Sequence, residues 1–325
     1  MLEASTGVKD MQDTEKKTVI CKENPNTPRL PKAPARKKRG KDRSDGRYLR
    51  TVYAMNKFMP YIMPQRCDAL NSFADEFEID AVENFCREMV ASGRENFSIL
   101  HVILAAYVRA VSQCPAMNRF ISGQRIYARN DISVVMTIKK EMTADSPETC
   151  IKVHFEPDDT LYDVYEKFDA VVQQNKESGD LDSDFDKTAS KLASMPRFLM
   201  RGAVRFLNWL DYHGKLPKSL LEVSPFHGGL IITSMGSLGI KPIYHHIYNF
   251  GNLPIFIAYG KKRIERKITR TGDIEAHKYI DVKVVTDERI CDGFQFASAF
   301  RLIKRYIEHP EQLLERPESI IEDID

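Results

Sequence analysis

A charged turn near the C-terminus holds the side chains best suited to chemistry. Asp287, Glu288, Arg289 and Asp292 lie within six residues of one another. Carboxylates and a guanidinium on a loop between two anchored elements are typical of places where a scaffold displays reactive groups. The same residue types are also compatible with simple salt bridging at the surface. The cluster therefore predicts either an acid–base site or an ion-pair network.

The flanking residues predict how this turn is held. Before it, apolar residues at 280, 282 and 284 alternate with polar ones, which is the period of a half-buried strand. Asp292-Gly293 is a turn pair, and Pro310 marks where the next element must stop. Between them, a helix is expected to bury one apolar face, made of Phe294, Ala297, Phe300, Ile303 and Ile307.

The middle of the chain mixes helical and strand patterns. Residues 97–111 are apolar almost all round and predict a buried helix capped by Ser98, with His101 as a core histidine rather than a ligand or base. Thr160 and Asp163 open another helix in the manner of a capping box. Strands are expected over residues 132–138, 150–155 and 254–260, and a Gly-rich strand and turn over 226–239. An edge strand is expected up to about residue 79, followed by a helix over 81–92.

Residues Arg197 to Tyr212 form an unusual helical pattern. Arg197, Arg201 and Arg205 recur at every fourth position and make one basic stripe beside an apolar face. A helix of this kind lies on a membrane surface or grips phosphate. The alternative is a helix docked on its own domain or on a neighbouring subunit. This alternative is favoured because only three positive charges lie in line.

Composition narrows the protein class. With 325 residues, 42% of them hydrophobic, the chain can bury a large core. Its net charge is +2, and residues 1–46 hold 12 basic against 7 acidic residues (+5), so the remainder is −3 and is not a nucleic-acid binder on charge grounds. The six cysteines are scattered without a C-x-x-C pair, which predicts a reducing cytoplasm and no zinc site. No apolar run suggests a signal peptide or a spanning helix.

Three segments are expected from these patterns. Residues 1–46 are polar, lysine-rich and proline-dotted, which predicts a disordered basic tail. Its basic run at 35–39 is either a targeting signal, a patch for an anionic surface or, as composition favours, part of a solvated tail. Residues 47–315 form the folded domain, and 316–325 an acidic C-terminal tail. We see no internal repeat.

Three motifs give the chain a family resemblance. The turn D-E-R-I-C-D-G resembles the D-H-R-x-x-D-G of the catalytic domain of 2-oxoacid dehydrogenase dihydrolipoyl acyltransferases and is similar to the H-x-x-x-D-G of chloramphenicol acetyltransferase. The run P-A-M-N-R-F after a buried helix is the second point of resemblance. The third is I-T-S-M-G-S-L-G with the strand P-I-F-I-A-Y-G that follows it. In order and spacing, the three cover about residues 50–315.

The resemblance implies roles for individual residues. It places Glu288 where those families have a histidine general base, and Thr233, with Ser234 as its neighbour, where a hydroxyl donates to the oxyanion. A local backbone hydrogen bond is the alternative use for either hydroxyl. It also implies that Asp292 fixes the loop through an arginine, for which Arg66 and Arg289 are the candidates.

Glutamate in the place of histidine changes the expected chemistry. With pKa values of ~4.3 for Glu and ~6.5 for His, the change makes deprotonation of a thiol of pKa ~8.5 less favourable by ~3 kcal/mol. Burial raises a carboxyl pKa by up to ~3–5 units, so Glu288 is a base only if it is desolvated. His227 and His246 are the substitute candidates; in a strand, only one of the adjacent His245 and His246 can face a given site.

The resemblance implies a chloramphenicol-acetyltransferase-like α/β sandwich, with a mixed sheet covered by helices, assembled as a homotrimer with sites between subunits. It implies a CoA-dependent acyltransferase without a lipoyl domain, acting on acyl-CoA or another acyl-thioester and using no metal. The alternative is a catalytically inactive homologue that serves as a binding, scaffold or membrane-associated protein. Periodicity alone predicts only a mixed α/β chain.

Overall fold

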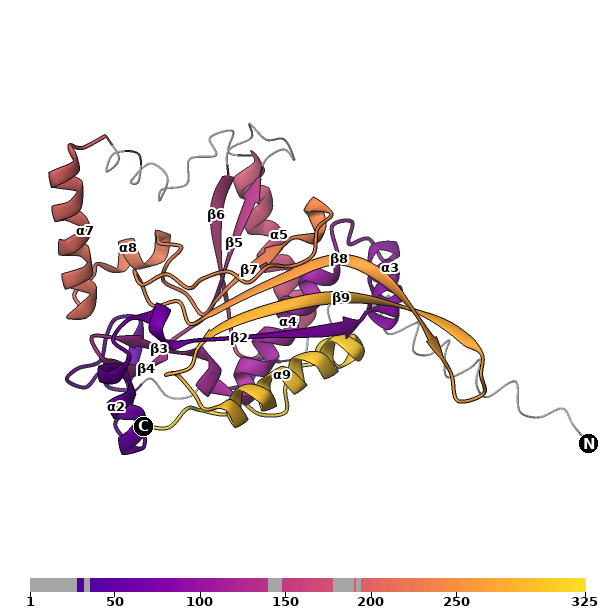
Figure 1. Cartoon of the computed structure of the whole chain (residues 1–325), viewed down its shortest axis with the longest axis horizontal. Helices are drawn as coiled ribbons and strands as arrows, with labels where there is room; N and C mark the ends of the chain where they lie inside the picture. Colours follow the sequence, from indigo (N-terminus) through magenta and orange to yellow (C-terminus); the bar gives the residue numbers. More distant parts are fainter. Residues whose placement is uncertain (1–27, 32–35, 140–147, 178–189, 191–193) are drawn as a thin grey trace, which may run out of the picture.

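A computed structural model describes residues 28–31, 36–139, 148–177, 190 and 194–325. Within them, a six-stranded sheet runs in the order β2-β9-β8-β7-β5-β6 (Figure 1). β7 pairs in parallel with β5 and β8, and the other neighbours are antiparallel, so the sheet is mixed. Its strands are β2 (Leu70–Glu78), β5 (Ile132–Lys139), β6 (Glu148–Phe155), β7 (Leu230–Ser234), β8 (Ile255–Ile268) and β9 (Ile274–Asp287).

Helices cover one face of this sheet and enclose the main core. They are α3 (Asp80–Ala91), α4 (Ile99–Gln113), α5 (Leu161–Glu177) and α9 (Gly293–Glu308). α4 is buried along nearly its whole length, as its sequence predicts. Strand residues such as Leu230, Ile232 and Val284 face this core, and their neighbours in sequence face the other way. The predicted two-layer α/β fold is thereby confirmed.

The second face of the sheet has a much thinner cover. A small apolar cluster on it joins Ile231, Phe256 and Val285 to Ile247 and Leu253 of the segment between β7 and β8. Exposed apolar side chains continue along that segment, among them Leu238, Ile240, Ile243 and Tyr244. This face is therefore only partly buried within one chain.

A smaller three-stranded sheet lies at one end of the molecule, in the order β1-β4-β3. It consists of β1 (Gly46–Tyr48), β3 (Arg119–Ser122) and β4 (Arg125–Arg129), and the sequence patterns gave no sign of it. Around it lie α2 (Ala54–Ile62), α7 (Arg197–Tyr212) and α8 (Lys218–Val223); Figure 1 shows α7 standing away from the sheet. Short 3₁₀ turns occupy Arg66–Ala69, Pro115–Asn118, Gly236–Leu238 and Pro310–Leu313.

Both flanks of the expected domain contact it where they are described. Arg43 is buried and donates to the Asp211 carboxylate at 2.6 Å, and Arg119 pairs with Asp323. Burial alone would raise the pKa of Asp211, but hydrogen bonding to His227 and the charge of Arg43 outweigh it and lower that pKa to about 2. The basic and acidic segments 36–46 and 316–325 therefore add ion pairs to the folded body, and the boundaries of the domain stay a prediction.

Two expected elements differ from those observed. β8 and β9 extend beyond the predicted strands into a long two-stranded arm over residues 261–279, whose side chains are mostly charged or exposed (Figure 1). In α9, the buried face consists of Phe296, Ala299, Phe300, Ile303 and Ile307. The prediction was wrong for Phe294 and Ala297, which are exposed. Phe294 lies nine residues before Ile303, and at about 100° per residue that places it on the opposite side of the helix.

No helix within the described part of the chain has the length and apolar character needed to span a bilayer. The described cysteines are all free, and Cys21 lies outside the described residues.

Candidate active site

A buried ion-pair triad fixes the turn that follows β9. Arg289 donates from its Nε and Nη2 to the two oxygens of Asp287, at 2.8 and 2.7 Å. Arg66 lies beside the same carboxylate, with its Nε 3.6 Å from Oδ2. Burial lowers the pKa of Arg66 to about 10, although the charge of Asp287 opposes that shift. The two arginines therefore hold the turn through the Asp287 carboxylate.

Their partner is Asp287 and not Asp292, so that part of the prediction was wrong. Asp292 is exposed and caps α9: its carboxylate accepts from the Gln295 N–H at 2.8 Å, and the Gln295 side chain accepts from the Asp292 N–H. This is a capping box, which satisfies backbone donors at the start of a helix. Asp292 therefore determines where α9 begins, and Asp287 determines the shape of the turn before it.

Glu288 lies between these fixed residues with a free carboxylate. Its backbone N–H donates to the Ala69 carbonyl at 2.9 Å, and within the described part of the chain no hydrogen bond or ion pair involves its side chain. The side chain is half-buried. The backbone of Glu288 is thus held in place while its carboxylate is free to receive a proton, but one chain alone does not desolvate it.

The two candidate oxyanion donors point to opposite faces of the sheet. Ser234 follows Leu230 and Ile232 onto the helix side, where it is hydrogen-bonded to the buried Tyr259 hydroxyl. Thr233 follows Ile231 onto the thinly covered face, and among the described residues its hydroxyl has no partner. Thr233 is therefore the hydroxyl that remains available for a substrate.

Strand register keeps Thr233 and Glu288 apart within one chain. Thr233 pairs with Ala258 on β8, and Ala258 pairs with Lys283 on β9. Glu288 lies five residues beyond Lys283 along the chain. At about 3.4 Å per strand residue, that offset alone is about 17 Å, so one chain does not bring the two groups together.

The predicted substitute bases are not suited to that role. His227 is buried; its Nδ1 lies 2.8 Å from the Ser224 hydroxyl and its Nε2 3.6 Å from Asp211. Burial lowers the pKa of His227, although Asp211 opposes the shift. His246 is exposed, and its ring meets the Tyr248 ring at 79°, edge to face. His101, as predicted, is a core histidine, with its Nδ1 accepting from the Ser98 N–H at 3.0 Å.

Sequence reasoning did not select His245, which the structure places on the thinly covered face. Its ring stacks on Phe256, with the centroids 4.2 Å apart, and its buried Nε2 has no partner among the described residues. Burial lowers its pKa, and so does the neighbouring His246. Phe256 is two residues from Ala258, the partner of Thr233, so His245 lies over the same part of the sheet. Both His245 and His246 lie in an irregular segment and not in a strand, so the expected alternation of the pair does not apply.

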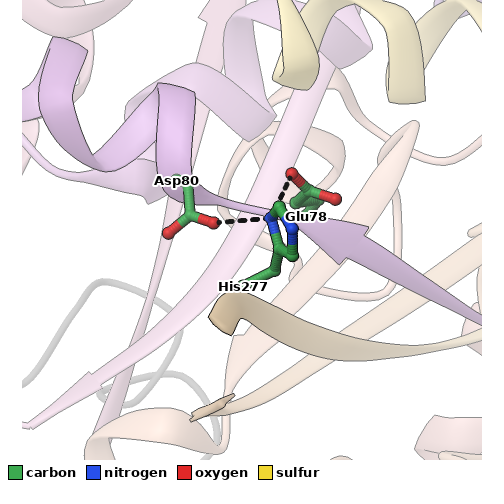
Figure 2. Close-up of side chains that lie close together, drawn as sticks. All are labelled: Glu78, Asp80 and His277. Atoms are coloured by element: carbon green, nitrogen blue, oxygen red, sulfur yellow. Dashed lines mark ion pairs between the residues drawn. The ribbon is translucent and has the colours of Figure 1, made fainter. Parts of the chain in front are cut away.

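A group of candidate metal ligands lies far from this turn, at the base of the β8–β9 arm. His277 Nδ1 is 3.2 Å from Glu78 and 3.4 Å from Asp80, and the three side chains converge in Figure 2. Their ligand atoms lie within 4.8 Å of one another. Acidic groups of this kind commonly gather without an ion, so the arrangement alone does not indicate a metal site.

Comparisons with known proteins bear on the segment that carries this turn and on the fold. Residues 209–315 match the family model of the 2-oxoacid dehydrogenases acyltransferase (catalytic domain). A probable dihydrolipoamide acetyltransferase from Listeria monocytogenes superposes with a TM-score of 0.50 at 13% identity, covering 79% of this chain and 93% of its own. A truncated catalytic core of the 2-oxoacid dehydrogenase multienzyme complex from Thermoplasma acidophilum gives 0.48 at 13% identity, with 81% and 99% covered.

Chloramphenicol acetyltransferase gives a TM-score of 0.48 at 12% identity, covering 79% of this chain and 96% of its own. Among curated proteins, a sequence search found no match. At these identities the structural likeness concerns the fold alone. The segment that carries Thr233, Glu288 and the Asp287–Arg289 pair thus matches the acyltransferase catalytic domain of the 2-oxoacid dehydrogenases, and the chain has the chloramphenicol-acetyltransferase-like fold.

Proposed function

We propose that the protein transfers an acyl group between coenzyme A and a second thiol, with Glu288 of one copy as the general base and Thr233 of a neighbouring copy as the oxyanion donor. The observation that carries this proposal is that the Glu288 side chain forms no hydrogen bond or ion pair within the described part of the chain. The Asp287–Arg289 pair holds the loop next to it, yet its own carboxylate has no partner among the described residues.

The chemistry requires a base, an oxyanion donor and a dry channel. Glu288 takes the thiol proton, the resulting thiolate attacks the thioester carbonyl, and the Thr233 hydroxyl donates to the developing oxyanion. Collapse of the tetrahedral intermediate expels the other thiolate, which recovers the proton from Glu288. A carboxylate performs this task near neutral pH only where burial raises its pKa.

A second copy supplies what one chain lacks. The half-buried Glu288 needs further cover, and Thr233 lies about 17 Å along the sheet from it by strand register. The partly covered second face, with its exposed apolar side chains, is suited to pack against another chain. A homotrimer, as the family resemblance implies, satisfies both needs.

The test is thiol release from short-chain acyl-CoAs in the presence of a dithiol acceptor. Glu288→Gln is expected to lower kcat by about 10²- to 10⁴-fold, and Glu288→His to retain activity. Thr233→Val is expected to lower kcat by about 10²- to 10³-fold. Glu318→Gln, the same change on an exposed residue without a partner, is the control. Full activity in Glu288→Gln together with loss in His245→Asn would move the base role to His245.

Mixing two inactive variants tests whether the site is shared. If each site takes Glu288 from one chain and Thr233 from the next, mixed oligomers of Glu288→Gln and Thr233→Val regain activity at about a quarter of their sites. No recovery after verified subunit exchange would refute a site shared between chains.

The half-exposed carboxylate of Glu288 also favours a second candidate, a catalytically silent homologue that binds a CoA-like ligand. Stoichiometric CoA binding by calorimetry without any thiol release, equal in the wild type and in Glu288→Gln, would support that candidate and reject the enzyme.

A further inference from the structure

Helix α7 exposes an apolar face that no residue of the described part of the chain covers. Phe198 is 73% exposed, Phe206 59% and Trp209 50%. Of its sixteen residues, only Asp211, near its end, is buried. Figure 1 shows the helix beside α8, away from the sheet and from the helices that cover it. Burial against the described residues therefore does not explain why the face is apolar.

The helix is strongly two-sided. At about 100° per residue, Arg197, Arg201 and Arg205 occupy one arc of about 80°, and Leu199 and Phe206 lie on the opposite side. Phe198 and Trp209 lie at the border between the two. Aromatic rings at the border and arginines on the polar side are the arrangement of helices that lie in the interface of a bilayer.

Charge points to an anionic partner. Residues 194–218 carry five Lys and Arg against the single Asp211, a net charge of +4, which leaves −2 for the rest of the +2 chain. The carboxylate of Asp211 forms an ion pair with Arg43. Within the described part of the chain, no ion pair involves any of the three α7 arginines. Lys218 lines a hollow together with the basic residues 36–39, which adds positive charge next to α8.

The helix is held at one end only. At its C-terminus, Asp211 pairs with Arg43, the Asp211 carbonyl accepts from Ser122, and the Tyr212 hydroxyl donates to Gln124 at 2.8 Å. These contacts fix the direction of α7, and among the described residues no ion pair or side-chain hydrogen bond holds its first three turns to the body.

We propose that α7 lies on the surface of an anionic lipid bilayer, with its apolar face in the headgroup region and its arginines against lipid phosphates. The occupant is a membrane and not a second copy of this chain, because the three arginines lack counter-charges and the aromatic side chains border them. This inference is independent of the proposed acyl transfer.

The test uses Trp209, which is the only tryptophan of the chain. Vesicles of phosphatidylcholine with phosphatidylglycerol are expected to co-sediment the full-length protein and to shift its tryptophan emission to shorter wavelength. Vesicles of phosphatidylcholine alone are expected to do neither. Changing Arg197, Arg201 and Arg205 together to Gln is expected to weaken partitioning on the order of 100-fold, since each cation near an anionic surface contributes about a factor of five.

The control carries the same change in charge elsewhere. Lys261, Arg266 and Arg270, which are exposed on the β8–β9 arm, are changed to Gln and should partition like the wild type. Far-UV circular dichroism checks that both triple variants fold. Equal binding to neutral and anionic vesicles, equal losses in both triple variants, or no binding at all would overturn the proposal. So would a change of oligomeric state in the α7 variant without vesicles, because that would show a second copy on this face.

Discussion

Asp287→Asn should be among the most destabilising conservative substitutions in this chain. The change keeps the shape of the side chain and removes the charge that Arg66 and Arg289 face; the side chain of Asp287 is 1% exposed, and those of the two arginines 6% and 2%. Breaking a buried pair by removing one partner costs about 3–5 kcal/mol in the free energy of unfolding, because the charge left behind is uncompensated. At ~2–4 °C per kcal/mol, the melting temperature should fall by roughly 6–20 °C.

The assay is thermal and urea denaturation followed by circular dichroism, with Asp292 as the comparison. Asp292→Ala removes the cap of α9 and should cost about 0.5–2 kcal/mol, whereas Asp292→Asn keeps a capping side chain and should cost little. Adding Arg289→Leu to Asp287→Asn should cost less than the sum of the two single changes. The reasoning is refuted if Asp292→Ala destabilises more than Asp287→Asn, which is the order expected if Asp292 fixed the loop.

Three further outcomes follow from burial elsewhere. Although burial alone would raise the pKa of Asp211, hydrogen bonding to His227 and the charge of Arg43 lower it to about 2, against an ordinary 3.8. Its carboxylate should therefore contribute about 2–3 kcal/mol of stability above pH 4, and this contribution is lost as the pH falls towards 2. The free energies of unfolding of the wild type and of Asp211→Asn, measured across acid pH, should converge there. Gly229→Ala places a Cβ 2.5 Å from a buried side-chain oxygen and should cost about 1–3 kcal/mol in urea denaturation, whereas Gly202→Ala, in open space, should be neutral or stabilising. Iodoacetamide should label the exposed Cys67 in the native protein and spare Cys291, whose thiol pKa burial raises, as mass spectrometry can check.

Elements with a strong local signal could be predicted from the sequence. Helix α7 has the predicted bounds, and α5 begins at the predicted Thr160–Asp163 cap, because these signals lie within one turn of the chain. The small sheet was missed because its strands are three to five residues long and pair across long stretches of chain. The β8–β9 arm was missed because its residues are mostly charged or exposed, so no core imposes an alternation.

The site was only partly predictable for a similar reason. Sequence motifs indicated Glu288, Thr233 and the two arginines, but not which carboxylate the arginines hold. Asp287 and Asp292 are both flanked by turn residues, and only tertiary contacts separate a buried ion pair from an exposed helix cap. His245 could be recognised only through its stack on Phe256, a contact between segments that local spacing does not encode.

Strand register also separates two possible general bases, Glu288 and His245. If Glu288 is the base, the site must be built from two chains. Within one chain, Thr233 on β7 and Glu288 after β9 are about 17 Å apart along the strand direction. If His245 is the base, Thr233 and the imidazole lie over the same part of one chain, and the activity would not depend on the neighbour's Glu288. Complementation between Glu288→Gln and Thr233→Val separates the two: only a shared site regains activity on mixing, whereas a site within one chain leaves Glu288→Gln active by itself.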